Sequence, residues 1–355
     1  MSMRDFRSDT VTRPSAAMRE AMFEAEVGDD VLDGDPTVRK LEEQAAEWLG
    51  KAGALFVPSG TMANQVAIGS WTRPGDELIC ERGSHVVCWE AGAAAANHGV
   101  QTQTFQSRTG SLSAQELEGL LRPGSEHCPR NVLLCIEQSF LGDGSGPGGL
   151  VIPMDEIEAM ADVCGENGIA IHMDGARLAN AVAASGEPAA AWASYADSVS
   201  ICLSKALGAP VGSIIAGDEE FLKRARTVRK RLGGWMRQAG FLAAAGSYAL
   251  SNNVERLVID HQNASDLATG FDALPGLACP AHEIQTNIVM VRIEDQSLDA
   301  PTLAARLASE GVGVMPMNGR VLRFVTHLDV DAEDVKAAID AMAACLQLKS
   351  AKNDG

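Results

Sequence analysis

The sequence predicts an α/β protein whose central sheet is mostly parallel and flanked by helices, followed by a smaller α+β domain. Short apolar segments of strand length alternate with helical patterns through most of the chain, as in parallel sheets with crossover helices. Around Ser251 a long helical segment leads into a different set of strands and helices. Because 355 residues exceed what one core usually supports, we expect a large domain over 1–250, with an N-terminal arm at 1–14, and a small domain over 251–355.

The expected elements follow from apolar runs and from helix-start signals. The predicted strands of the large domain are 54–57, 77–80, 132–137, 169–174, 198–203 and 213–216. The small domain is expected to contain strands 287–293 and 321–326 and helices 301–310 and 332–346. Asp35 before Pro36 predicts a helix start, and Ser113 with Glu116 predicts a capping box.

Composition argues against several classes of protein. A net charge of −18 opposes binding to nucleic acid, because phosphate backbones are bound through accumulated Lys and Arg. No apolar run approaches the roughly 20 residues of a membrane helix, and the N-terminus has no signal-peptide pattern, so we expect no membrane partner and a cytoplasmic location. The eight cysteines show no C-x-x-C pair and are interpreted as reduced packing residues, with no metal site.

Two strand ends carry residues typical of catalysis. The strand 169–174 delivers Asp174 and then Arg177, and the strand 198–203 is followed by Lys205. Ligands of open α/β sheets bind at the carboxyl ends of strands. Taken singly, Asp174 could be a helix cap and Lys205 a surface charge. Together they match pyridoxal phosphate, which needs a carboxylate for its pyridine nitrogen and a lysine for its aldehyde.

A phosphate site is expected where the strand 54–57 runs into a helix through Ser59, Gly60 and Thr61. Free backbone N–H groups and the helix dipole favour a dianion there. The alternative is an ordinary N-capped helix. His85 could stack on a pyridine ring and relay protons, or be a hydrogen-bonded core histidine.

The whole pattern resembles the low-specificity L-threonine aldolases, a family of fold-type I pyridoxal-phosphate enzymes, over nearly the entire chain. The resemblance rests on a set of motifs in a fixed order: Arg7-Ser-Asp-Thr-Val-Thr-Arg-Pro14, Val27-Gly-Asp-Asp30, Asp35-Pro-Thr37, Pro58-Ser-Gly-Thr61, His85 with Glu90-Ala-Gly92, His172-Met-Asp-Gly-Ala-Arg177, Leu203-Ser-Lys-Ala-Leu-Gly208, Met236-Arg-Gln-Ala-Gly240 and Arg323-Phe-Val-Thr-His327. It implies aldol cleavage of β-hydroxy-α-amino acids, of the threonine, allo-threonine or phenylserine type, to glycine and an aldehyde.

The resemblance also implies how the cofactor is held. Pyridoxal 5'-phosphate would be bound as a Schiff base on Lys205, with Asp174 paired to the pyridine nitrogen and His85 over the ring. The phosphate would bind at 59–61. Arg177 would lie beside the cofactor.

Further residues would serve the substrate and the assembly. Ser8, Arg177 and Arg323 resemble the groups that hold the substrate carboxylate. Lys230 and Arg237 resemble residues that reach the phosphate region of a neighbouring subunit, although the basic stretch around them could be a solvated helix face. The resemblance implies a homotetramer built from two dimers.

Two departures from the family pattern concern the substrate's β-carbon. Phe140 stands where similar enzymes have a histidine thought to contact the substrate hydroxyl, and Leu32 replaces a tyrosine. The glycine-rich stretch 142–149 that follows is a few residues longer and could bring Asp143 or Ser145 into the histidine's place. His85, or a water that it orders, then remains as the base, and the apolar replacements favour bulky β-substituents.

Other readings of the sequence stay open. The glycines of 144–149 formally match a dinucleotide-binding motif, but Leu150-Val-Ile-Pro153 intervenes before helical spacing begins. Another pyridoxal-phosphate reaction, such as β-elimination or transamination, would release a keto acid instead of glycine. A non-catalytic binding protein would leave Asp174, Arg177 and Lys205 unexplained.

Overall fold

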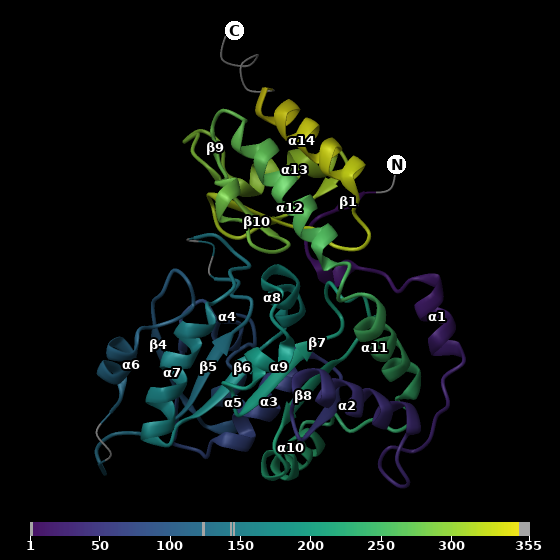
Figure 1. The fold of residues 1–355 in the computed structure, drawn as a ribbon. Coiled ribbons are helices and arrows are strands. Elements are labelled where there is room, and N and C mark those ends of the chain that lie inside the picture. The colour runs from purple at the N-terminus through teal and green to yellow at the C-terminus, as the bar shows by residue number, and fades with distance from the viewer. Residues whose placement is uncertain (1–2, 123–124, 143, 145, 348–355) are drawn as a thin grey trace.

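A computed structural model describes residues 3–122, 125–142, 144 and 146–347 (Figure 1). Its larger sheet has seven strands in the order β2-β8-β7-β6-β5-β3-β4. The strands are β2 (Gly53–Val57), β3 (Glu77–Glu81), β4 (Gln101–Phe105), β5 (Asn131–Glu137), β6 (Ala170–Asp174), β7 (Ser198–Cys202) and β8 (Ser213–Gly217). Only β8 runs against its neighbours, so the carboxyl ends of the other six strands meet at one edge.

The six predicted strands of this sheet are confirmed to within about one residue at each end, but β4 was missed. Its sequence, Gln101-Thr-Gln-Thr-Phe105, is mostly polar and largely exposed. As an edge strand it needs no apolar face on both sides, so hydrophobic patterning gives no signal for it.

Helices pack against the sheet, and their starts agree with the sequence. They are α1 (Ala16–Phe23), α2 (Pro36–Leu49), α3 (Gly60–Trp71), α4 (His85–Cys88), α5 (Ala93–His98), α6 (Ala114–Leu120), α7 (Met154–Asn167), α8 (Leu178–Ser185), α9 (Ala189–Ala193), α10 (Glu219–Arg231) and α11 (Gly240–Asn252). Asp35 caps α2 by accepting hydrogen bonds from the backbone N–H groups of Thr37 and Val38. Ser113 and Glu116 form the predicted capping box of α6.

The C-terminal part has its own antiparallel sheet of four strands in the order β12-β13-β10-β9. Its elements are α12 (Leu257–Asp272), β9 (Leu277–Ala278), β10 (Ile288–Ile293), α13 (Ala300–Ser309), β12 (Met315–Pro316), β13 (Val321–Val325) and α14 (Ala332–Gln347). The two strands and two helices expected there are confirmed. A separate core holds it together, with the rings of Phe271 and Phe324 in contact at 4.8 Å. The division of the chain at residue 250 stays a prediction.

The N-terminal arm joins the C-terminal part, whereas we expected it with residues 1–250. Strand β1 (Arg4–Asp5) pairs with β11 (Val312–Gly313), and the buried ring of Phe6 lies 6.0 Å from that of Phe324. Burial of this aromatic side chain gives the arm its anchor. Figure 1 shows the arm leaving the C-terminal part and descending to α1.

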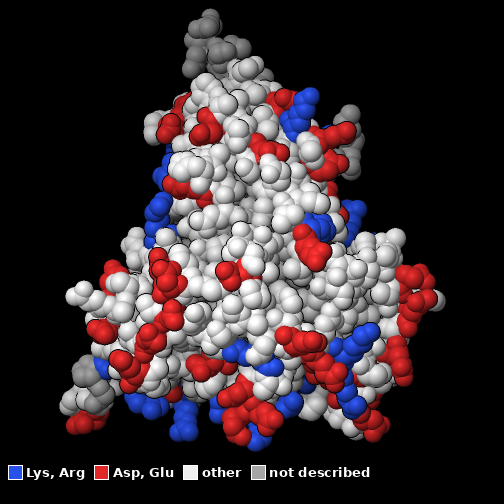
Figure 2. Space-filling view, viewed as in Figure 1, with Lys and Arg blue, Asp and Glu red and all other residues white. Residues whose placement is uncertain are grey.

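Acidic side chains are spread over the surface (Figure 2), in agreement with the net charge of −18. On the face shown in Figure 2, acidic side chains are distributed over both parts of the molecule, and Lys and Arg occur in small groups among them. In the described part of the chain no helix is long and apolar enough to cross a membrane.

Candidate active site

The carboxyl edge of the large sheet brings the predicted chemical groups together. Asp174 ends β6, and Glu137, at the end of β5, is its register partner. Lys205 follows three residues after the end of β7, the strand on the other side of β6. Because these strands are parallel, their side chains gather at one place, as expected for an open α/β sheet.

Asp174 is buried and charged. Its Oδ2 accepts a hydrogen bond from Asn64 Nδ2 (2.7 Å), and its Oδ1 accepts one from the backbone N–H of Ala176 (3.0 Å). Burial raises the pKa of this carboxyl, but the positive charges of Lys205 and His85 and the bond from Asn64 outweigh burial and leave the pKa below its ordinary value. An ionised, buried carboxylate is what a protonated pyridine nitrogen requires.

His85 begins the short helix α4 and is oriented by Glu90. Its Nδ1 lies 2.8 Å from Glu90 Oε1, which also accepts from Asn64, while Glu90 Oε2 accepts from Gln65. Burial lowers the pKa of His85, but the bond to Glu90 and the charge of Asp174 more than offset this, so the pKa is raised. Since Glu90 accepts at Nδ1, Nε2 is the atom left to exchange a proton.

Glu137 carries the opposite pKa shift from its neighbour. Burial, and then the negative charge of Asp174, raise the pKa of Glu137. Its carboxyl accepts from the backbone N–H groups of His85 (2.8 Å) and Leu141 (2.9 Å). His85, Glu137 and Asp174 line one small, tightly packed pocket at this edge. Two adjacent carboxyls with diverging pKa values are a feature of functional sites.

The segment 59–61 forms the N-terminus of the 12-residue helix α3. Ser59 is its cap, since Ser59 Oγ accepts from the backbone N–H of Met62 (3.2 Å). A Cβ on Gly60 would lie 2.6 Å from Cys202 Sγ, so only glycine fits there. The first turn presents N–H groups that have no partner within the helix, and Thr61 adds a half-buried hydroxyl. These features fit a phosphate group.

Arg177 and Arg323 meet where the arm, the large sheet and the C-terminal part converge. Arg177 is buried and donates two hydrogen bonds of 2.8 Å, from Nε and Nη2, to the two carboxylate oxygens of Asp9. Arg323 donates from Nη2 to the carbonyl of Arg7 (3.0 Å), and within the described residues its buried Nε has no hydrogen-bond partner. Burial, and then the charge of Arg177, lower the pKa of Arg323 to about 10. An anion bound here would offset that repulsion. Ser8 lies next to Asp9 and is half-buried.

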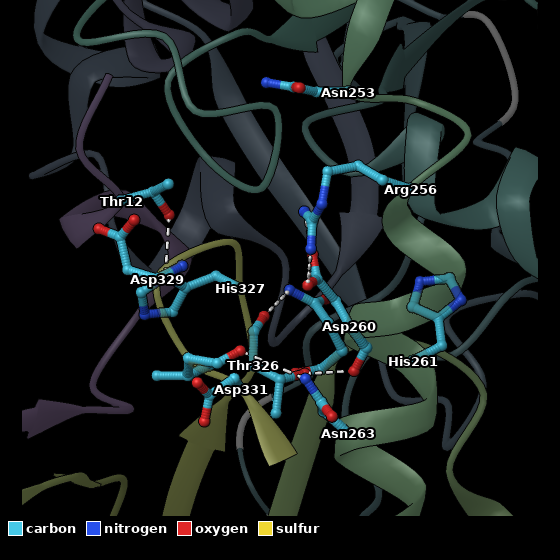
Figure 3. A network of polar contacts seen from close by, with 12 residues as sticks. Thr12, Asn253, Arg256, Asp260, His261, Asn263, Thr326, His327, Asp329 and Asp331 are labelled. Carbon is cyan, nitrogen blue, oxygen red and sulfur yellow. Dashed lines mark hydrogen bonds and ion pairs between the residues drawn. The ribbon is translucent and has the colours of Figure 1, made fainter. Parts of the chain in front are cut away.

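Further polar contacts fix this junction, as Figure 3 shows. His327 Nδ1 lies 3.1 Å from Thr12 Oγ1 of the arm, and Thr326 Oγ1 donates to the carbonyl of Asp260 (2.6 Å). Asn287 donates to Asp9 Oδ2 at 3.3 Å. The arm and the segments that carry Arg177 and Asn287 therefore meet at Asp9.

Lys230, Arg237 and Leu32 lie at the surface of the single chain. Lys230 is exposed and lies 5.7 Å from the Trp235 ring, and Arg237 pairs with Asp29 at the surface. Leu32 is 75% exposed.

Phe140 is a buried core residue in the structure, and its role at the substrate's β-carbon stays a prediction. It is 3% exposed, belongs to the large core, and lies against Gly110, where a Cβ would be 2.6 Å from its ring. Its surface is therefore already covered by protein. Asp143 and Ser145 lie outside the described residues.

A cation site was not expected, and the closest approach to one overlaps the site above. Ligand-type atoms of His85, Glu90 and Asp174 lie within 4.8 Å of one another. Glu90 and Asp174 already share the donor Asn64, and His85 is bonded to Glu90. The arrangement is explained by these hydrogen bonds, and the absence of a metal stays a prediction.

Sequence reasoning missed Asn64 and Asp9 as parts of the site. Asn64 stands one helical turn after Gly60, so a polar residue on the buried face of α3 was an available signal. Asp9 follows Ser8 in the first motif, but nothing in the sequence indicates that it bonds a residue 168 positions away.

Comparison with known proteins agrees with this geometry. The beta-eliminating lyase family model matches residues 5–295. Low-specificity L-threonine aldolase 1 of Arabidopsis thaliana is 40% identical over 93% of this chain and 93% of its own length. Low specificity L-threonine aldolase of Escherichia coli O157:H7 is also 40% identical, over 94% of this chain and 96% of its own length.

Solved structures show the same fold. Leishmania major threonine aldolase matches with a TM-score of 0.79 and 22% identity over 97% of this chain and 99% of that chain. A serine palmitoyltransferase variant from S. paucimobilis with a bound PLP–myriocin aldimine matches with a TM-score of 0.74 and 20% identity over 98% of this chain and 87% of that chain. The fold is that of fold-type I pyridoxal-phosphate enzymes, and the residues around Asp174 and Lys205 fit that cofactor. The chain belongs to the beta-eliminating lyase family and, within it, to the low-specificity L-threonine aldolases.

Proposed function

We propose that the protein cleaves the Cα–Cβ bond of β-hydroxy-α-amino acids and releases glycine and an aldehyde. The observation that carries this proposal is the meeting of an ionised, buried Asp174 with Lys205 at adjacent strand ends. The 40% identity to low-specificity L-threonine aldolases supports the same substrate class. When bound, pyridoxal phosphate supplies a protonated ring that withdraws electrons from the substrate's α-carbon.

Each side chain of the large sheet's edge has a role in this proposal. Lys205 supplies the amine that holds the cofactor, and Asp174 keeps a proton on the ring nitrogen. Ser59, Gly60 and Thr61 bind the phosphate through the helix N-terminus. His85 would lie over the ring, and its Nε2 would be available to the reacting groups because Nδ1 is bonded to Glu90.

The substrate carboxylate is bound between Arg177 and Arg323, with Ser8 beside them. The unpartnered, buried Nε of Arg323 and the mutual repulsion of two guanidinium groups both favour an anion at this place. Asp9 occupies Nε and Nη2 of Arg177 and so fixes the plane of its guanidinium. A fixed carboxylate orients the Cα–Cβ bond relative to the ring.

His85 is the proposed base for the β-hydroxyl. It takes the hydroxyl proton at Nε2, the Cα–Cβ electron pair stays with the α-carbon, and the β-carbon leaves as an aldehyde. Protonation of the α-carbon completes glycine. Burial lowers the pKa of His85, but the bond to Glu90 and the charge of Asp174 raise it above its ordinary value, which makes the imidazole a stronger proton acceptor.

We further propose a homotetramer of two dimers in the cytoplasm. Lys230 and Arg237 are exposed, as groups that serve a neighbouring subunit's phosphate site must be in an isolated chain. Large apolar side chains, including Phe23 and Leu32, are also exposed, which favours a subunit interface over this region. Sedimentation analysis of the purified protein tests the assembly.

Product analysis tests the reaction. Purified protein is supplied with threonine, allo-threonine and phenylserine, and glycine, aldehyde, keto acid and ammonia are measured. Equal amounts of glycine and aldehyde are the expected result. A keto acid with ammonia would identify β-elimination instead, and bound NAD without a pyridoxal chromophore would refute the cofactor assignment.

A further inference from the structure

A third buried arginine, Arg229, lies outside the site described above and is bonded to the strand that leads into the phosphate-binding segment. Arg229 lies in the last turn of α10, yet it is only 3% exposed. Its Nη1 donates to the backbone carbonyl of Phe56 (2.8 Å) and lies 3.5 Å from Glu42 Oε1. Phe56 is three residues before Ser59.

Glu42 completes the hold on Phe56. Its Oε1 accepts from the backbone N–H of Phe56 at 2.8 Å, so the N–H and C=O of this residue are bonded by an acidic side chain from α2 and a basic one from α10. Strand β2 lies at one edge of the sheet, and among the described residues its one neighbouring strand is β8. The Glu42–Arg229 pair therefore takes the place of a missing neighbouring strand at the residue where β2 approaches Ser59.

Arg229 also holds the loop that follows α10. Its guanidinium lies 5.0 Å from the ring centre of Trp235, and its Nη2 lies 3.8 Å from Asp30 Oδ2. Trp235 Nε1 donates to the same Oδ2 at 2.7 Å. Arg229, Trp235 and Asp30 thus form one contact group that joins α10 to the loop before α2.

The loop that follows α10 packs directly against the phosphate-binding segment. A Cβ on Gly234 would overlap Met62 and lie 3.3 Å from Pro58, the residues on either side of the cap of α3. The backbone N–H of Gly234 bonds the carbonyl of Arg229 (2.9 Å). A displacement of Arg229 would therefore shift Pro58 in two ways, through its bond to Phe56 of β2 and through Gly234.

We propose that Arg229, paired with Glu42 and Asp30, is a positioning residue that sets the geometry of the phosphate site at 59–61. Arg229 would touch neither cofactor nor substrate. Arg229 would act by holding Phe56 and Gly234. The proposal rests on the proposed function only in assigning 59–61 to the cofactor's phosphate. Its loss should weaken binding of the phosphate group and leave Lys205 able to react with an aldehyde.

The test compares pyridoxal phosphate with pyridoxal, which has the aldehyde but no phosphate. Equilibrium dialysis of both against cofactor-stripped, full-length protein gives two dissociation constants for each variant. For Arg229→Met we expect the dissociation constant of pyridoxal phosphate to rise about tenfold or more, because small misplacements of binding groups are costly. That of pyridoxal should change less than about twofold. Arg229→Lys keeps the charge but not the planar guanidinium group. Its dissociation constant for pyridoxal phosphate should lie between those of wild type and Arg229→Met.

The matched control is Arg226→Met, which removes a charge from an exposed position one turn earlier on the same helix. Both constants should stay within about twofold of wild type, because Arg226 makes no bond to Phe56. If Arg229→Met does not fold, Glu42→Gln is compared with the exposed Glu43→Gln, and only the former should weaken pyridoxal phosphate selectively.

Two results overturn the proposal, and they differ from failure of the proposed function. Unchanged affinity for pyridoxal phosphate in folded Arg229→Met, or an equal loss for both ligands, removes the positioning role alone. Wild-type protein that binds neither ligand at Lys205 refutes the proposed function, and the role of Arg229 with it.

Discussion

The cofactor edge of the sheet and the junction around Arg323 are both buried and charged, yet they differ in how completely their groups are bonded. At the edge, Asn64, Glu90 and Asp174 are linked by hydrogen bonds of 2.7–2.8 Å. At the junction, two guanidinium groups repel each other, and Arg323 Nε is without a partner among the described residues. We expect the site of a permanently bound cofactor to consist of groups that are already hydrogen-bonded. A substrate that binds and dissociates can itself supply the missing partner of Arg323.

In the edge region, Asp174→Asn is expected to reduce turnover most. The amide cannot hold a proton on the pyridine nitrogen, so turnover should fall by about 10²-fold or more while cofactor stays bound. Steady-state kinetics and the cofactor content of the purified variant check both halves. Turnover near that of wild type would end the proposed role of Asp174.

Arg323→Ala is the corresponding change at the junction, and its effect should have a different form. Loss of a charge-assisted contact costs about 1.5–3 kcal/mol, which corresponds to roughly 10–100-fold in kcat/KM, mostly through KM. Cofactor should stay bound, as in Asp174→Asn, but the loss should lie in KM instead of turnover. A variant with wild-type KM, or one that loses cofactor, would erase the distinction between the two regions.

The pH profile sharpens the role of His85. To accept a proton His85 must be neutral, so kcat/KM should fall as pH falls through its raised pKa. Glu90→Gln weakens the bond that raises this pKa, and the acid limb should therefore move to lower pH. An unmoved limb would show that another group sets it.

Phe140→His has the smallest expected effect. The sequence suggested that Phe140 favours bulky β-substituents, and this stays a prediction; the structure places the ring against Gly110 in the core. If the preference holds, wild type cleaves phenylserine more efficiently than threonine, and the variant shifts the ratio toward threonine by about tenfold or less. A wild-type preference for threonine that the variant leaves unchanged would remove Phe140 from the substrate site.

The contrast between the two regions also explains what the sequence could predict. Asp174 and Lys205 were placed correctly relative to each other because parallel strands bring their carboxyl ends to one edge. Local signals likewise located Ser59 as a helix cap. The partners of Arg177 and Arg229 lie 168 and 173 residues away and obey no periodicity, so only the folded chain shows them. The arm's pairing with β11 was hidden for the same reason.

Reduction of the purified protein with borohydride, followed by peptide mapping, tests the central assignment most directly. We predict that the yellow colour is bleached irreversibly and that a single pyridoxyl group is found on Lys205, because an amine at this strand end lies beside ionised Asp174. Lys205→Ala should show neither colour nor label. A pyridoxyl group on another lysine of the wild-type protein would contradict the assignment.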